Sequence, residues 1–235
     1  MNSSLISIVI NAYNAQAALE RQLAHWAGFA PEVRARLEVV IVDDGSAQPL
    51  FVEPGKLPQG LRFTLARIEE DIAWNMPGAR NLGALLARGP FLLMHDIDHF
   101  LSGDGVALLQ SHLHQLSAKT LYNFPRELDG ERINPPVNCF LCSRDGFWQV
   151  GGYDEDFAGA YGHEDGYFLR QWRERVGDML MLTDLHWEVQ PRFATQHLSR
   201  DTTRNSALYR QKVATPPAPA STRLRFPWTV QVLAS

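Results

Sequence analysis

The sequence predicts an α/β fold in which a mostly parallel central sheet carries helices on both faces. Short apolar, β-branched segments alternate along the chain with segments of helical periodicity, and this alternation is typical of such folds. A chain of 235 residues fits one domain of this class, and an apolar content of 45% is enough for a sizeable core. Sheets of this kind bind ligands beyond the carboxyl ends of their parallel strands. A site is therefore expected where polar residues follow the strands.

Four strands are predicted in the first hundred residues. The apolar segment 5–10 precedes a helix that has Ala18, Leu19, Leu23 and Trp26 at helical spacing. The next apolar segment is uninterrupted enough to be buried on both faces, as parallel strands are. The further strands are predicted at residues 37–42, 62–68 and 91–94, and a helix at residues 79–87 precedes the last of them.

The second half of the chain continues the alternation. Helices are predicted at residues 106–116 and 164–175, and strands at residues 119–124, 137–143 and 187–189.

The composition changes near the C-terminus. Residues 215–222 are rich in proline and cannot form a helix. We expect one domain over residues 1–212 and a Pro-rich tail, extended or disordered, over residues 213–235.

Charge and cysteine content exclude several classes of function. The net charge of -4 provides no basic field for nucleic acid, so no nucleic-acid partner is expected. The chain starts without the basic region of a signal peptide and has no apolar segment of bilayer length, which indicates a soluble, cytoplasmic protein. Arg223 and Arg225 are too few basic residues to predict more than peripheral membrane contact.

The side chains of Cys139 and Cys142 would point to opposite faces of a strand. We therefore expect both cysteines to be buried, and neither to form a disulfide nor to chelate a metal as a pair.

Three predicted strands are followed by polar residues that could share one crevice. The first is followed by Asn11, the second by Asp43 and Asp44, and the fourth by Asp96-Ile97-Asp98. Side chains two apart on a strand point the same way, so Asp96 and Asp98 could hold one divalent ion. Carboxylate oxygens suit Mg²⁺ or Mn²⁺, which bridge protein carboxylates to substrate phosphates. A polar strand end facing water, and an ordinary turn at Asp43-Asp44-Gly45-Ser46, are the alternatives.

The strongest candidates for a general base are Glu164 and Asp165. They follow a glycine-rich segment and begin a predicted helix, so a substrate hydroxyl would have room to approach them. Acidic residues also stabilise a helix N-terminus whatever the function, which leaves capping as the alternative.

For two basic residues, the local sequence alone does not separate a functional role from a structural one. His197 could add an imidazole ligand to a metal, although a lone histidine is more often structural. Arg80 could reach a diphosphate, or it could be a solvated arginine in a first helical turn.

Six segments stand out when they are taken together. In order, they are Ser7-Ile-Val-Ile-Asn-Ala-Tyr-Asn14, Val40-Ile-Val-Asp-Asp-Gly-Ser46, Ala79-Arg-Asn-Leu-Gly83, Asp96-Ile-Asp98, Gly151-Gly-Tyr-Asp-Glu-Asp-Phe157 and Glu164-Asp165. Over residues 5–200, this set resembles the inverting family 2 glycosyltransferases of GT-A fold. The Trp74-Asn75 segment is similar to the galactosyltransferase and chondroitin-polymerase-like branch of that family.

The resemblance implies a role for each candidate residue. This sequence departs from the family pattern at Asn11-Ala12, where a Pro-Thr pair is more usual. The implied roles are nucleobase contact for Asn11 and Asp44, nucleotide contact for Arg80, ribose or metal contact for Asp96, metal ligation for Asp98 and His197, acceptor contact for Glu164, and the catalytic base for Asp165.

The expected function is transfer of a sugar from a nucleotide diphosphate donor, of UDP type, to a hydroxyl of a glycan or other acceptor, with Mn²⁺ or Mg²⁺ as cofactor and with inversion. Two alternatives remain open. A sugar nucleotidylyltransferase would need a glycine-rich, basic loop near the N-terminus, and residues 11–18 do not contain one. A non-catalytic nucleotide-sugar-binding module would keep the fold without turnover.

Overall fold

The computed structural model describes residues 5–128, 130–190, 198–215 and 224–233 of the chain. Within them, the main sheet has eight strands in the order β10-β6-β9-β4-β1-β2-β3-β12. A smaller sheet has the order β5-β11-β7-β8. The strands of the main sheet are β1 (Ile6–Ala12), β2 (Leu37–Asp44), β3 (Arg62–Ile68), β4 (Phe91–Asp96), β6 (Leu121–Asn123), β9 (Phe140–Ser143), β10 (Met179–Met181) and β12 (Trp228–Leu233).

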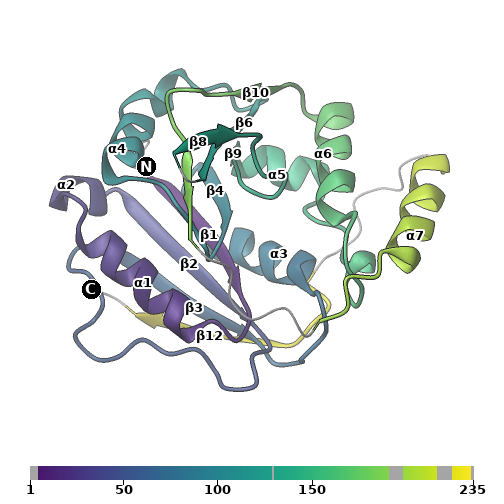
Figure 1. Cartoon of the computed structure of the whole chain (residues 1–235), viewed down its shortest axis with the longest axis horizontal. Coiled ribbons are helices and arrows are strands. Elements are labelled where there is room, and N and C mark those ends of the chain that lie inside the picture. Colours follow the sequence, from purple (N-terminus) through teal and green to yellow (C-terminus); the bar gives the residue numbers. More distant parts are fainter. Residues whose placement is uncertain (1–4, 129, 191–197, 216–223, 234–235) are drawn as a thin grey trace.

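Helices lie on both faces of the main sheet, and the most C-terminal helix lies apart from it (Figure 1). The helices are α1 (Gln16–Ala27), α2 (Pro31–Arg34), α3 (Met76–Leu86), α4 (Gly103–His112), α5 (Arg144–Val150), α6 (Glu164–Arg175) and α7 (Thr203–Ala214). Two short 3₁₀ helices are η1 (Leu113–Gln115) and η2 (Glu155–Phe157), and the smaller sheet contains β5 (His99–Phe100), β7 (Arg126–Leu128), β8 (Glu131–Ile133) and β11 (Trp187–Val189).

The alternation of side chains along β1 divides the core into two layers. Ile8 and Ile10 face α1, where they join Trp26 in one cluster, whereas Val9 faces α3. A Cβ atom at Gly83 of α3 would overlap the Val9 side chain, so glycine allows this helix to lie against the sheet. The α/β architecture with helices on both faces is thus confirmed.

Parallel pairing places the site-bearing strand ends together. Strands β4, β1, β2 and β3 are consecutive neighbours and mutually parallel, whereas β9 and β12 pair antiparallel with β4 and β3. The register pairs Asn11 of β1 with Asp96 of β4, and Ala12 with Asp43 of β2. The carboxyl ends of these three strands therefore form one edge, as the sequence predicts.

The C-terminal region differs from the expected tail. Residues Trp228–Leu233 form β12, which pairs with β3 over six residues and gives the main sheet its last strand. Trp-Thr-Val-Gln-Val-Leu has the β-branched and aromatic composition of a strand, and pairing covers an otherwise open edge of the sheet. The helix α7 also runs past residue 212, to Ala214. Trp228–Leu233, within the expected tail, is therefore part of the main sheet.

Two further boundaries refine the predictions. Helix α3 begins at Met76, three residues before the predicted start, with Pro77 in its first turn, where proline is tolerated. Helix α6 begins at Glu164 as predicted, after His163, whose backbone is left-handed with φ 73°. Among the described residues, none of the helices is long and apolar enough to cross a bilayer.

Candidate active site

Arg80 is at the centre of the candidate site. It lies on α3, beneath the strand ends, and its side chain is only 1% exposed. Its Nη2 donates to Asp96 Oδ1 at 3.0 Å, its Nε donates to Asn11 Oδ1 at 3.3 Å, and its Nη1 donates to the Tyr153 hydroxyl at 2.8 Å. The same Nη1 lies 3.5 Å from Asp165 Oδ1. One buried guanidinium thus joins β1, β4 and the start of α6, and the solvated alternative for Arg80 is wrong.

The surrounding groups keep Arg80 charged. Burial alone would lower the pKa of its guanidinium, but Tyr153, Asp165 and Asp96 raise that pKa above its usual range. A buried cation is tolerated when ionised and hydrogen-bonding partners surround it, as they do here. Arg80 is therefore a fixed positive charge between the strand end and Asp165.

Tyr153 connects Arg80 to the candidate base. Its ring is fully buried and stacks on Phe168 of α6, with the ring centroids 4.6 Å apart. Its hydroxyl accepts from Arg80 and donates to Asp165 Oδ1 at 2.8 Å. This chain of contacts fixes the orientation of the Asp165 carboxylate. Tyr153 therefore belongs to the core and also links the two charged residues.

The two acidic residues at the start of α6 have perturbed proton affinities. Burial raises the pKa of Asp165, although Arg80 and Tyr153 act against it. Burial, followed by the charge of Asp165, raises the pKa of Glu164 to about 7. Asp165 accepts a hydrogen bond from Tyr153, and its side chain is only 13% exposed. A residue that only caps a helix needs neither this contact nor this burial, and both features are typical of functional sites. A carboxylate with a raised pKa is a stronger proton acceptor.

The loop before α6 has the backbone geometry that only a glycine-rich sequence readily allows. Gly159 and Gly162 have φ values of 93° and 89°, in the left-handed region. The Gly159 N–H donates to the Ala73 carbonyl at 2.9 Å, which ties this loop to the loop before α3. The side chains of Trp74 and Tyr161 meet where the loops touch, with ring centroids 4.6 Å apart.

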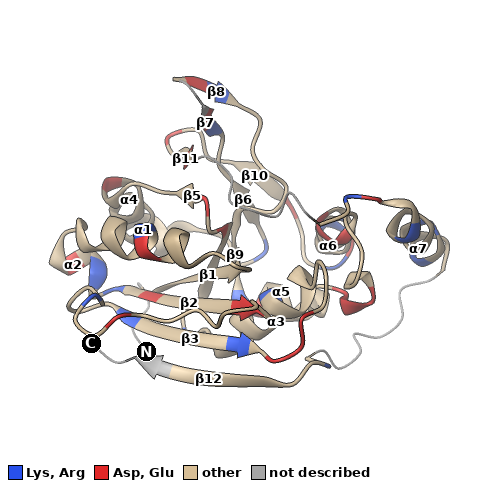
Figure 2. Cartoon of the chain, turned by 60° about the horizontal axis from the view of Figure 1, so that its bottom comes forward, with Lys and Arg blue, Asp and Glu red and all other residues tan. Residues whose placement is uncertain are grey.

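Asp43 and Asp44, at the end of β2, have different environments. Asp43 is an anchor: it forms an ion pair with Arg67 of β3 at 2.6 Å and accepts from the Ser46 and Leu50 N–H groups. Figure 2 shows the acidic end of β2 beside the basic end of β3. The turn predicted as the alternative for this motif is therefore present at Asp43.

Asp44 is buried on the candidate-site side of that turn, next to Asn75. Burial raises its pKa to about 8, Asn75 lowers it, and Asp43 and then Asp71 raise it further. The Asp44 Oδ1 atom and both polar atoms of the Asn75 side chain are buried without a hydrogen-bond partner within the described ranges. Buried polar atoms of this kind call for a partner, so Asp44 and Asn75 are suited to ligand contact.

The structure describes two of the three predicted metal ligands. Asp96 and Asp98 have side chains that are 32% and 15% exposed, and such carboxylates can offer oxygen atoms to a hard divalent cation. Asp98 lies in the turn between β4 and β5, so the alternation expected along a strand does not relate it to Asp96. His99 Nδ1 lies 2.7 Å from Asp98 Oδ1. His197 falls outside the described residues, and its role stays a prediction.

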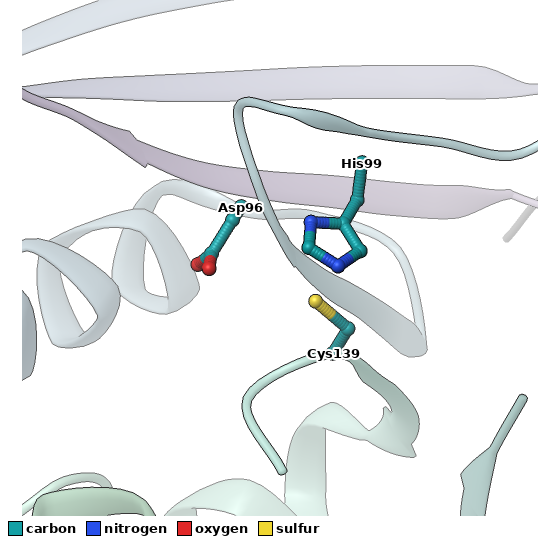
Figure 3. Close-up of side chains that lie close together, drawn as sticks. All are labelled: Asp96, His99 and Cys139. Atoms are coloured by element: carbon teal, nitrogen blue, oxygen red, sulfur yellow. The ribbon is translucent and has the colours of Figure 1, made fainter. Parts of the chain in front are cut away.

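Two features of the site were not anticipated from the sequence. The first is a buried carboxylate, Glu155, which accepts from the Asn81 side chain at 2.8 Å and from the Leu224 N–H at 2.7 Å. The second is the proximity of Cys139 to Asp96 and His99: their ligand atoms all lie within 4.8 Å of one another (Figure 3). Motif spacing carries no signal for either contact, because the partners are far apart in the sequence.

A family model and two curated relatives match the chain. The model of "Glycosyl transferase family 2" matches residues 7–162, about two thirds of the chain. Two curated relatives are validoxylamine A glucosyltransferases of Streptomyces hygroscopicus. The one from subspecies limoneus is 29% identical over 214 residues, covering 68% of this chain and 46% of the relative. The one from subspecies jinggangensis is 28% identical, with 68% and 49% covered. The chain thus spans about half the length of the curated relatives it matches.

Solved structures share the fold at low sequence identity. S. aureus TarS 1–349 in complex with UDP-GlcNAc superposes with a TM-score of 0.65 and 14% identity, covering 92% of this chain and 68% of TarS. GalNAc-T7 with UDP, GalNAc and Mn²⁺ gives a TM-score of 0.61 and 17% identity, covering 85% and 45%. The fold, the residues at the strand ends and the family match lead to one assignment. The chain belongs to glycosyl transferase family 2.

Proposed function

We propose that the chain transfers a hexose from a UDP-type donor to an acceptor hydroxyl, with inversion at the anomeric carbon. The observation that carries this proposal is the position of Arg80, which contacts Asp96 at the strand end and Asp165 at the start of α6. A donor group at the strand ends would then lie beside a carboxylate that can take a proton. The family match favours transfer over the nucleotidylyltransferase and binding-only alternatives.

The donor end of the site is assigned to the edge formed by β1, β2 and β4. Asn11 and Asp44 are assigned to the nucleobase, and Arg80 and Asp96 to the ribose and phosphates. The UDP complexes of TarS and GalNAc-T7 support a uridine nucleotide. The side chain of Asn75 is buried beside Asp44. The resemblance of the Trp74-Asn75 segment supports placing the chain near the galactosyltransferase and chondroitin-polymerase-like branch.

A divalent cation is part of the proposal. Asp98 and Asp96, together with His197, would hold Mn²⁺ or Mg²⁺, which would neutralise negative charge on the departing diphosphate. The Mn²⁺ complex of GalNAc-T7 supports this choice.

The acceptor end is assigned to the start of α6. Asp165 Oδ1 already accepts from Tyr153, so we assign the acceptor's proton to Asp165 Oδ2. As the acceptor oxygen bonds to the anomeric carbon, the bond from that carbon to the donor phosphate breaks, and the proton passes to Asp165. Glu164, whose pKa is raised to about 7, is assigned to hydrogen bonding with an acceptor hydroxyl in either protonation state. The acceptor is a glycan or another hydroxyl compound.

The test is donor turnover by purified protein. A panel of UDP-hexoses is incubated with Mn²⁺, with and without sugar acceptors, and UDP release is measured. Replacing a general base reduces turnover by about 10²–10⁴-fold, so Asp165→Asn should do so while calorimetry shows UDP binding within about threefold of wild type. Asp98→Ala should instead weaken Mn²⁺-dependent UDP binding.

A matched control is available on another helix. Asp104 is an exposed acidic residue in the first turn of α4, as Asp165 is in the first turn of α6. Asp104→Asn should leave turnover unchanged. Full turnover by Asp165→Asn would remove it from the role of base, and no UDP release from any donor would remove the proposed function.

A further inference from the structure

His99 has one ring nitrogen that the fold does not use. It lies in β5, next to Asp98, and its side chain is only 7% exposed. Nδ1 lies 2.7 Å from the Asp98 carboxylate, so this contact engages one side of the ring. Nε2, on the other side, is buried with no hydrogen-bond partner among the residues that the structure describes. A buried polar atom of this kind calls for a partner.

Two further ligand atoms lie close to the His99 ring. The Asp96 carboxylate, at the end of β4, and the Cys139 thiol, just before β9, lie with the His99 ring so that all three ligand atoms are within 4.8 Å of one another. Figure 3 shows the ring and the thiol facing each other, with the Asp96 carboxylate beside them. Cys139 is fully buried, whereas Asp96 is 32% exposed and connects the cluster to solvent.

The chemistry of this set differs from that of a magnesium or manganese site. Nitrogen, sulfur and oxygen ligands together favour Zn²⁺, which binds three protein ligands and keeps a fourth position open in reactive sites. A carboxylate that holds the second nitrogen of a ligating histidine is a recurrent feature of zinc sites, and Asp98 occupies that position.

We propose that Asp96 Oδ, His99 Nε2 and Cys139 Sγ form a site for a thiophilic divalent cation of the zinc type, with Asp98 orienting His99. Binding converts the thiol to a metal thiolate and releases one proton to solvent. Asp96 already accepts from Arg80 at 3.0 Å and from the Asn138 side chain at 2.5 Å, and carboxylate oxygens have further lone-pair directions. The negative charges of Asp96, Asp98 and the thiolate would attract the bound cation and so offset its repulsion by the positive charge of Arg80.

The site would regulate transfer, and this consequence alone rests on the proposed function. Asp96 would serve both the zinc-type cation and the donor-bound Mn²⁺. The two cations would therefore compete, and Zn²⁺ would inhibit transfer in a manner that depends on Cys139.

The test uses Co²⁺ as a spectroscopic substitute for Zn²⁺, with the full chain and no nucleotide. Wild type should develop the sulfur-to-cobalt charge-transfer absorption and the visible bands of a four-coordinate ion, and Zn²⁺ should displace both. Cys139→Ser should remove the charge-transfer band and weaken Co²⁺ binding. Asp98→Asn should keep the band and weaken binding by about 10–100-fold, as loss of an orienting carboxylate does.

Cys142 provides the matched control. It is the other fully buried cysteine, on β9, and its side chain packs in the core layer on the opposite face of the sheet. Cys142→Ser should keep the band, and circular dichroism checks that both variants are folded. A charge-transfer band that is absent from folded wild type, or that survives in Cys139→Ser, would overturn the proposal. Because UDP release is not the readout, these results are distinct from a failure of the transferase proposal.

Discussion

Replacing Arg80 with methionine tests whether one buried charge controls the base. The substitution keeps an unbranched side chain and removes the guanidinium, whose Nη1 lies 3.5 Å from Asp165 Oδ1. An opposite charge within about 4–6 Å lowers a carboxyl pKa by about 1–3 units. Because Arg80 opposes the raised pKa of Asp165, its loss should raise that pKa further. The acid limb of the pH–rate profile should move to higher pH by about 1–2 units.

The same substitution should lower stability in a pH-dependent way. Breaking a buried ion pair by removing one partner costs about 3–5 kcal/mol, because the other charge stays buried. In the variant, the folded state holds a proton on Asp165 at pH values where the unfolded state has lost it. Stability should therefore fall as pH rises from the ordinary range of an Asp carboxyl through the raised pKa of Asp165. Guanidinium unfolding at pH 5 and pH 8 measures the difference.

Arg67→Met is the control for this experiment. Arg67 forms an ion pair with the buried Asp43 at 2.6 Å, and none of the observed contacts joins this pair to Asp165. The control should lose stability but keep the acid limb of any residual activity at the wild-type pH. If Arg80→Met leaves the acid limb in place, or if both variants shift it equally, the electrostatic account of the base is refuted.

Three further predictions concern buried carboxyl groups. Burial raises the pKa of Asp44 to about 8 from an ordinary 3.8, so wild-type stability should fall as pH rises between these values. Asp44→Asn should be more stable than wild type at pH 9, by about 2–5 kcal/mol, with no such gain at pH 3.5, as urea unfolding would show. Glu155→Gln should weaken charge-assisted bonds to residues 224–225 by about 1.5–3 kcal/mol in total, and should speed amide exchange in β12. Glu164→Gln removes a negative neighbour of Asp165, so the acid limb should move to lower pH.

Each of these predictions has a contradicting outcome. Equal stability of Asp44→Asn and wild type at pH 9 would mean that Asp44 is solvated. Unchanged exchange in β12 of Glu155→Gln would show that strand pairing alone holds the C-terminal segment. A loss of turnover in Glu164→Gln as large as that expected for Asp165→Asn would mean that Glu164 itself accepts the proton.

The sequence alone predicts the helices and strands that follow from local patterns of apolar residues. Continuous apolar segments gave β2 and β4, and helical spacing gave α6 with its observed first residue, because these patterns reflect burial on two faces or on one. The meeting of Asn11 and Asp96 follows from the geometry of parallel strands, since their ends share an edge. These parts of the fold needed no long-range information.

The remaining features depend on contacts between distant segments. Arg80 has the local sequence of an exposed first-turn arginine, and only the packing of α3 under the strand ends buries it. β12 joins the sheet because β3 offers an open edge, and Glu155 becomes buried because the C-terminal segment returns across it. Cys139 approaches His99 for the same kind of reason, since β9 runs antiparallel beside β4.

A crystal structure of the chain with UDP and Mn²⁺ tests the central claim most directly. Our account predicts the uracil beside Asp44 and Asn11, the cation against Asp98, and the β-phosphate facing Asp165 across a space the size of one hexose. A diphosphate bound away from the strand ends, or an Asp165 carboxylate that opens into a different cavity, would contradict it.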